Sequence, residues 1–209
     1  MLRIYCYQTG MRKADDHSME FQWVLYLITS YLVGGLMTGF IVAKVLRGHD
    51  LRVMGSGNIG ARNAGRVLGP PGFVLTLAGD ILKAAAVVWA GIELGFPSYI
   101  QLLGFLAVII GHLYPIFLGF KGGKGVASFI GGLLVFNWLS AVLVGAAFLL
   151  FYSIKRSLTV AGLFAFALAP FFYWLLEKQW LETLILIPIS LLVLYVQKDD
   201  IKERLMLRE

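Results

Sequence analysis

Long apolar stretches separated by short polar segments make up most of this chain. A membrane helix needs about 20 predominantly apolar residues, and stretches of roughly this kind predict spans at residues 21–46, 72–96, 99–118, 158–176 and 181–196. The apolar run 126–154 is interrupted at Phe136-Asn137-Trp138, so it forms either one long span or two short ones. The pattern therefore predicts an all-α integral membrane protein.

The distribution of basic residues favours two spans in the interrupted run, because cytoplasmic loops of membrane proteins carry an excess of Lys and Arg. With seven spans, the segments 47–71 and 119–125, the pair Lys155-Arg156 and the charged tail share the cytoplasmic side. With six, Lys155-Arg156 and the tail would face outward. We therefore predict seven transmembrane helices, with the N-terminus outside and the C-terminus cytoplasmic.

The same pattern divides the chain into three units: a polar tail at residues 1–20, a seven-helix membrane domain at 21–197 and a charged cytoplasmic tail at 198–209. The first unit lacks the apolar stretch of a signal peptide, and Met11 and Met19 are alternative starts. Composition agrees with a membrane protein, because 59% of the 209 residues are hydrophobic and 14% are charged. A soluble domain has about 25% charged residues.

The first polar segment is rich in glycine and carries two arginines. It reads Gly55-Ser56-Gly57-Asn58-Ile59-Gly60-Ala61-Arg62-Asn63-Ala64-Gly65-Arg66. Glycines free the backbone for unusual turns, whose N–H groups can cradle an anion. Arginine suits phosphate because its planar fork binds two oxygens at once. The segment is either an anion site or a flexible loop whose basic residues hold anionic lipid headgroups.

The second polar segment combines histidine, lysine and glycine. It reads Gly111-His112-Leu113-Tyr114-Pro115, followed by Phe120-Lys121-Gly122-Gly123-Lys124-Gly125-Val126-Ala127. Two glycines between two lysines at the start of a helix are typical of an anion site. The spacing does not fit the nucleotide-binding pattern G-x-x-x-x-G-K-[ST], so ATP is not implied. His112 is either a structural hydrogen-bonding residue or part of the site.

Charged residues inside the predicted spans are few. Asp80 and Lys83 lie three residues apart on one helical face. Charges within a membrane are costly and tend to pair, so we predict a supporting ion pair, with a structural or a site role. Glu93 and Glu182 are predicted to lie at the outer interface. Zinc-binding and nucleophile-elbow motifs do not occur, so we expect no metal and no cofactor.

These segments resemble the bacterial acyl-phosphate:glycerol-3-phosphate acyltransferase family (PlsY). The likeness rests on residues 55–66, on His112 with residues 120–127, and on Asp80-Ile81-Leu82-Lys83, and it extends over residues 21–208. The resemblance implies a seven-helix enzyme of the bacterial inner membrane with its active site facing the cytoplasm. Such an enzyme transfers a fatty acyl group from acyl phosphate to the 1-hydroxyl of glycerol 3-phosphate, which yields lysophosphatidic acid and phosphate in phospholipid biosynthesis.

With this resemblance, four residues are expected to take part in catalysis. Ser56 and Asn58 would orient the substrate and stabilise an oxyanion, His112 would act as a base or an orienting group, and Lys124 would neutralise phosphate. The segment from Lys121 to Lys124 would bind one phosphate and the loop from Ser56 to Arg66 the other. Predicted phosphate-binding residues are Gly57, Gly60, Asn63, Arg66, Lys121, Gly122, Gly123, Gly125, Ser157 and Thr159. Membrane lipid is an expected partner, and nucleic acid is not.

Several positions depart from the family pattern. Arg62 stands where the family usually has Thr, and Val160 replaces the last Ser of a motif that begins at Ser157. After the last span, Gln197 replaces a His and Asp200 an Asn. Two alternatives therefore stay open: a divergent member with an altered acceptor or lost activity, and a membrane transporter of a phosphorylated anion. The transporter would need access from both faces, and the outer face carries few polar residues.

Overall fold

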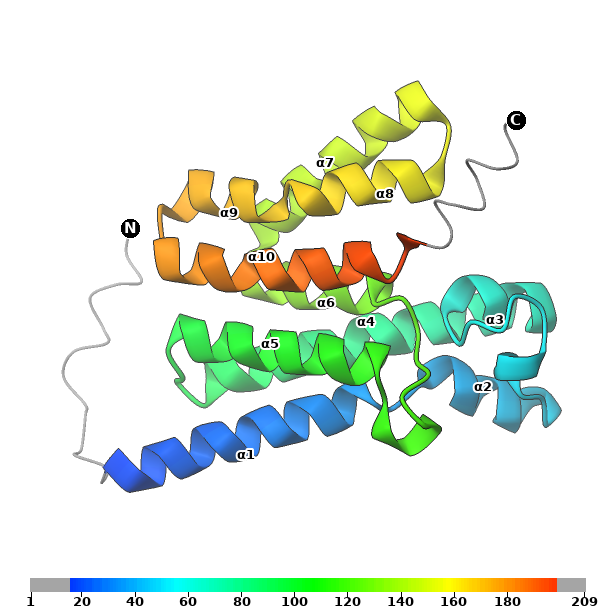
Figure 1. Ribbon diagram of the computed structural model, residues 1–209, viewed down its shortest axis with the longest axis horizontal. Coiled ribbons are helices and arrows are strands. Elements are labelled where there is room, and N and C mark those ends of the chain that lie inside the picture. Colours follow the sequence, from blue (N-terminus) through cyan, green and yellow to red (C-terminus); the bar gives the residue numbers. More distant parts are fainter. Residues whose placement is uncertain (1–15, 199–209) are drawn as a thin grey trace.

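The computed structural model describes residues 16–198, which form a bundle of α-helices (Figure 1). Residues 1–15 of the predicted N-terminal tail, and residues 199–209 of the C-terminal tail with Asp200, lie outside the described residues. The first helix begins at Asp16, inside the segment predicted as a polar tail. The all-helical prediction is confirmed for the described residues, which contain no strand.

The predicted first span is not one continuous helix. It divides into α1 (Asp16–Gly34) and α2 (Thr38–Arg47), with a bend of 41° between them. Gly34 packs against the backbone of Val108, so close that any side chain there would collide with it. Because the helical hydrogen bonding stops here, the carbonyl of Leu36 is available to accept a hydrogen bond from Lys83 Nζ at 3.0 Å. Hydropathy alone does not register such a break.

The predicted loop at residues 47–71 contains regular structure. It includes a 3₁₀ turn, η1 (Leu51–Val53), and a short helix, α3 (Ala61–Leu68), which packs against α4 (Pro70–Glu93). The loop prediction was wrong for α3 because this helix is strongly polar on one face. Such a sequence is stabilised by packing one side against a neighbour rather than by overall hydropathy.

The remaining helices follow the predicted order closely. They are α5 (Ser98–Leu113), the 3₁₀ turn η2 (Ile116–Leu118), α6 (Val126–Phe136), α7 (Trp138–Lys155), α8 (Leu158–Ala167), α9 (Ala169–Glu177) and α10 (Trp180–Tyr195). The interrupted run does form two helices. Asn137 separates them, because its side-chain oxygen accepts a hydrogen bond from Ser140 N at 2.8 Å and so caps α7.

The described helices differ in whether they are long enough to cross a membrane. Four stretches are long and apolar enough, at Pro70–Glu93, Ser98–Leu118, Trp138–Lys155 and Leu158–Glu177, and the bent pair α1–α2 makes a fifth. Two further apolar helices, α6 and α10, are shorter, with 11 and 16 residues. The protein is therefore a multi-pass membrane protein.

The polar connections gather at one end of the bundle, on the right in Figure 1. There lie α3, the segment that joins α5 to α6, the turn between α7 and α8 and the end of α10. The start of α1 and the turn between α9 and α10 lie at the opposite end. The tryptophans of the chain fall in the helix portions nearest that opposite end: Trp23, Trp89, Trp138, Trp174 and Trp180. Between the two ends, large buried side chains of α5 and α6, among them Phe105 and Phe129, form the core.

Candidate active site

A cavity of about 1280 Å³ opens among the helices and extends from the polar end of the bundle. Residues of α3, α4, α6, α7 and α8 supply most of its wall, with His112 from α5 and Gln197 beyond α10. Eleven of the residues predicted as site residues line it: Ser56, Asn58, Gly60, Asn63, Arg66, Asp80, His112, Lys124, Gly125, Ser157 and Thr159. Segments that are more than a hundred positions apart in the sequence therefore meet at one cavity.

The polar part of the cavity is strongly cationic. Arg62, Arg66, Lys124 and Lys155 line it, whereas Asp80 is the one carboxylate among the described lining residues, and it is paired with Lys83. This excess of positive charge suits a ligand that carries one or more phosphate groups.

The side chain of Asn63 organises the first glycine-rich segment. Its Nδ2 lies 2.9 Å from the carbonyl oxygens of both Met54 and Asn58, and its Oδ1 accepts a hydrogen bond from Ser56 N at 2.8 Å. Asn63 is buried, with 2% of its surface exposed. These contacts use both ends of its amide, so Asn63 holds the loop in shape. The sequence had instead predicted that Asn63 binds phosphate.

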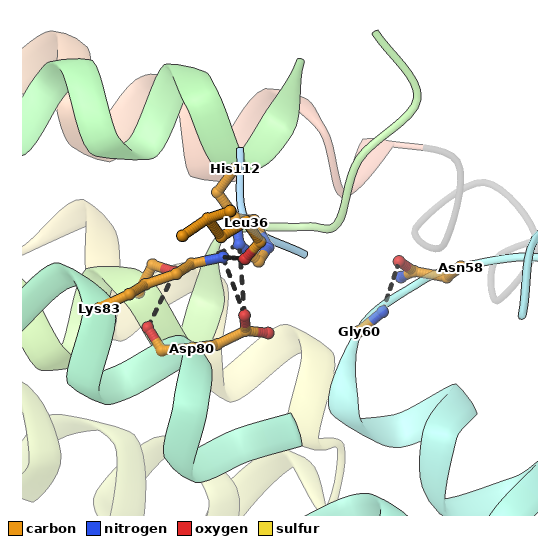
Figure 2. A network of polar contacts seen from close by, with 7 residues as sticks. Leu36, Asn58, Gly60, Asp80, Lys83 and His112 are labelled. Carbon is orange, nitrogen blue, oxygen red and sulfur yellow. Dashed lines mark hydrogen bonds and ion pairs between the residues drawn. The ribbon is translucent and has the colours of Figure 1, made fainter. Parts of the chain in front are cut away.

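The two catalytic candidates of this loop face the cavity. Ser56 and Asn58 both line it, and Asn58 Oδ1 accepts a hydrogen bond from Gly60 N at 3.2 Å (Figure 2). Gly55 and Gly57 have φ of +61° and +74°, which strain any residue other than glycine. Gly57 does not line the cavity, so it contributes to the turn that presents Ser56 and Asn58.

The second glycine-rich segment folds back onto the end of α5. Gly122 N donates a hydrogen bond to Leu113 O at 3.2 Å, and Gly123 N donates one to His112 O at 3.0 Å. A side chain at Gly123 would collide with the imidazole of His112. The prediction that these two glycines bind phosphate through their N–H groups therefore needs correction, because α5 carbonyls already accept those hydrogen bonds. The glycines instead allow the segment to lie directly against His112.

The two lysines of this segment differ in position. Lys124 lines the cavity at the start of α6, together with Gly125. Lys121 is exposed and is not among the lining residues. The fold thus brings one lysine of the predicted pair to the site and leaves the other at the surface.

A buried polar network lies beneath the cationic end (Figure 2). Lys83 Nζ lies 2.9 Å from Asp80 Oδ1, as the predicted ion pair requires, and it also reaches the carbonyl of Leu36 at the break between α1 and α2. The side chains of both partners are at least nine-tenths buried. A buried pair of this kind is costly to break, because removal of one partner leaves the other charge uncompensated.

His112 joins this network through a residue that the sequence did not reveal. Ser128 of α6 donates its hydroxyl hydrogen to Asp80 O at 3.1 Å and lies 3.3 Å from His112 Nδ1. With its one hydrogen donated to Asp80 O, the hydroxyl can only accept from His112 Nδ1, which favours the tautomer with the proton on that nitrogen. Asp80 Oδ1 lies 3.7 Å from the same nitrogen. In that tautomer Nε2 is the unprotonated nitrogen, and it faces Gly123.

Three residues complete the polar wall. Ser157 caps α8 by accepting a hydrogen bond from Val160 N at 3.4 Å, and Thr159 follows it, both buried. Gln197 is buried as well and donates from Nε2 to Val193 O at 3.1 Å. Three of the positions that depart from the family pattern, Arg62, Val160 and Gln197, thus lie at the cavity itself.

Sequence reasoning missed Ser128 and did not assign Lys155 to the site. Ser128 lies in an apolar helix directly after the motif that ends at Ala127, and only the packing of α6 against α4 and α5 brings it to His112. Lys155 could have been found from the sequence, because it is a basic residue next to Arg156 at the cytoplasmic end of a predicted span. Glu182, predicted at the outer interface, lies in the first turn of α10, where it is buried and accepts a hydrogen bond from Ser98 Oγ at 2.6 Å.

The deeper part of the cavity is apolar. Its lining includes Leu77 of α4, Leu133 of α6, Phe148 of α7 and Phe164 of α8. At about 1.5 Å per residue, the lining positions along α7 from Lys155 to Ala141 cover roughly 21 Å. A cavity with cations at one end and such walls below fits a molecule with a phosphorylated head and a long apolar tail.

Comparisons with known proteins agree with this chemistry. A family model described as glycerol-3-phosphate acyltransferase matches residues 24–206. A Bacillus cereus protein named glycerol-3-phosphate acyltransferase 1 is 43% identical over 183 residues, which cover 88% of this chain and 99% of that protein. A Desulfitobacterium hafniense protein of the same name is 36% identical over 86% of this chain and 89% of its own length.

Solved structures give the same result for the fold. The chain is similar to the crystal structure of PlsY (YgiH), an integral membrane glycerol 3-phosphate acyltransferase, in its glycerol 3-phosphate form. The TM-score is 0.82 and the identity 32%, over 90% of this chain and 94% of that one. The lysophosphatidic acid form of that protein matches with a TM-score of 0.81 and 30% identity.

Proposed function

Since this chain belongs to the glycerol-3-phosphate acyltransferase family, we propose that its acyl donor is a fatty acyl phosphate. The enzyme then transfers the acyl group to the 1-hydroxyl of glycerol 3-phosphate and releases lysophosphatidic acid and inorganic phosphate. One observation carries this proposal: a single cavity has four Lys and Arg side chains at its polar end and apolar walls below. Donor and acceptor each bring a phosphate, and the donor also brings an apolar tail.

The cationic residues divide between two phosphates in this proposal. Lys124 neutralises one phosphate, and Arg66 with the loop from Ser56 neutralises the other. Because two phosphates side by side repel each other, cations on both sides of the cavity lower the cost of bringing them together. Lys155 and Arg62, which line the same polar end, add to this field.

The reaction needs no covalent intermediate with the enzyme. Acyl phosphate is a mixed anhydride and is already activated, so orientation of the hydroxyl toward the acyl carbon is the main task, and orientation supplies up to about 7–11 kcal/mol in favourable cases. The hydroxyl oxygen forms the new ester bond while the bond from acyl carbon to phosphate oxygen breaks. The hydroxyl proton passes to a phosphate oxygen of the substrates. Ser56 and Asn58 donate hydrogen bonds to the carbonyl oxygen as negative charge develops on it.

His112 holds the site in shape in this scheme. Its backbone carbonyl and its imidazole both contact Gly123, the residue before Lys124. Its Nδ1 is tied to Ser128, which in turn binds the backbone of Asp80. His112 is therefore a positioning residue that connects α4 and α6 to the segment carrying Lys124.

We further propose seven membrane crossings, with the N-terminus outside and the active site on the cytoplasmic side of the bacterial inner membrane. The five long spans and the two shorter apolar helices α6 and α10 supply them. The described Lys and Arg residues support this orientation, because apart from Lys83 within α4 and Lys178 they belong to the polar end of the bundle. The tryptophans near the opposite end suit a membrane interface.

The donor is tested with purified protein in lipid bicelles, with glycerol 3-phosphate and either palmitoyl phosphate or palmitoyl-CoA. The expected result is lysophosphatidic acid from palmitoyl phosphate and none from palmitoyl-CoA. Equal turnover with the thioester would overturn the choice of donor while leaving the acyltransferase assignment in place.

A further inference from the structure

Gly145 of α7 occupies an unusual place among the glycines of the described helices. A methyl group placed on Gly131 would collide with the backbone of Ile81, and one on Gly132 with the ring of Phe105, so these glycines permit close helix packing. A methyl group on Gly145 would meet no heavy atom within 4 Å. Every other glycine within the described α-helices has at least one such neighbour.

Neither packing nor backbone conformation therefore requires glycine at this position. The residue lies within α7 and has ordinary helical backbone. Glycine inside a helix lowers its stability relative to alanine. Gly145 is exposed and is also part of the cavity lining, so the open space beside it includes the cavity.

The depth of Gly145 places it along the path of an acyl chain. It lies ten positions before Lys155 on α7, which corresponds to roughly 15 Å below the cationic end. Leu133 of α6 and Phe166 of α8 line the cavity at a similar depth, about 13–14 Å from Lys124 and Ser157 along their own helices. Large side chains thus form two of the walls at this level, and α7 contributes none at position 145.

We propose that Gly145 determines the longest acyl chain that the enzyme accepts. This inference rests on the proposed function, because a tail reaches this depth only when the donor binds with its phosphate at the cationic end. A short tail ends above Gly145, whereas a long tail passes it. A side chain at position 145 therefore excludes long tails and leaves short ones unaffected.

The test compares octanoyl phosphate with palmitoyl phosphate at saturating glycerol 3-phosphate, in the wild type and in Gly145→Leu and Gly145→Ala. We expect Gly145→Leu to lower kcat/KM for palmitoyl phosphate by about tenfold or more and to change that for octanoyl phosphate by less than about twofold, because pocket walls discriminate by such factors per group excluded. Gly145→Ala shifts the ratio in the same direction by a smaller factor. Activity with the short donor reports that each variant is folded.

Ala146→Leu is the matched control, since Ala146 is the next residue on α7, is exposed and does not line the cavity. This variant should have the same kcat/KM as the wild type for both donors. If Gly145→Leu lowers both donors equally, or changes neither, the role of Gly145 is overturned while the acyltransferase function stands. If the wild type turns over neither acyl phosphate, the proposed function itself fails, and this inference fails with it.

Discussion

The two glycine-rich segments at the polar end look alike in sequence but are built differently. In the segment at residues 55–66, a side chain inside the loop, that of Asn63, binds the backbone and leaves Ser56 and Asn58 facing the cavity. In the segment at residues 119–125, the N–H groups of two glycines bind carbonyls of α5. We call residues 55–66 the arch, because a side chain within this segment holds its backbone in shape. We call residues 119–125 the strap, because this segment lies against α5.

The difference shows that glycine and charge in a sequence do not by themselves define a phosphate site. In the arch, glycine permits the turns that expose polar groups to the cavity. In the strap, Gly123 has no side chain, so the backbone can lie directly against His112. The next residue, Lys124, then lines the cavity. The conformation of the strap therefore depends on close packing against His112, and that of the arch depends on the hydrogen bonds of the Asn63 side chain.

The largest expected difference in kcat/KM is between variants of the two lysines of the strap. Lys124→Ala should lower kcat/KM by about a hundredfold, because loss of a hydrogen bond to a charged group costs roughly 1.5–3 kcal/mol. Lys121→Ala is the matched control, since that side chain is exposed and lies outside the cavity lining, and it should stay within about threefold, as for an exposed charge. Initial rates of lysophosphatidic acid formation measure both. Equal losses in the two variants would contradict the assignment of Lys124 to the site.

The next largest difference is in stability, between a glycine variant in the strap and one in the arch. Gly123→Ala forces a methyl group into the imidazole of His112, and overpacking of this kind costs about 1–3 kcal/mol. Gly60→Ala is the comparison, because its nearest neighbour would lie at an ordinary 3.6 Å. Thermal unfolding in detergent should show a lower Tm for Gly123→Ala and little change for Gly60→Ala. The reverse order would mean that the strap is not packed against His112.

A smaller effect tests what holds the arch. Asn63→Ala removes the contacts to Ser56, Met54 and Asn58 and should lower kcat/KM by about tenfold, because roughly 1 kcal/mol is lost per hydrogen bond and part of the loop relaxes. Amide hydrogen exchange should become faster at residues 54–60 while α5 and α6 stay protected. Unchanged exchange in the loop would show that Asn63 is not its organiser.

The smallest effect concerns His112. As a positioning residue, it should tolerate His112→Gln with a loss of no more than about fivefold in kcat/KM, well below the 10²–10⁴ that general acid–base catalysis typically contributes. Ser128→Ala should cause a similar or smaller loss, and the pH dependence of kcat should keep its shape in both variants. A loss beyond about a thousandfold in His112→Gln would instead identify His112 as a direct acid–base group.

Much of the fold could be predicted from the sequence. Apolar runs located the long helices, and the interruption at Asn137 marked the boundary between α6 and α7. The break between α1 and α2 escaped, because hydropathy averages over Gly34 and Gly35 while the bend arises where the chain packs against α5. The helix α3 escaped for the opposite reason, since its residues are too polar to register as a hydrophobic run.

The candidate site was only partly predictable. Residues that carry charge or sit in glycine-rich motifs were found, and the Asp80–Lys83 pair is confirmed at 2.9 Å. The roles of Asn63, Gly122 and Gly123 were not apparent, because a hydrogen-bonding group near a site binds either ligand or protein, and only the fold decides which. Ser128 could not be found at all, since its partners come from two other helices.

The central claim is that one cavity brings an acyl phosphate and glycerol 3-phosphate together. It is tested most directly by measuring phosphate release from palmitoyl phosphate by the purified wild-type protein, with and without glycerol 3-phosphate. The account predicts release that depends on glycerol 3-phosphate and is matched, mole for mole, by lysophosphatidic acid. Folded protein that releases no phosphate when glycerol 3-phosphate is added would contradict it.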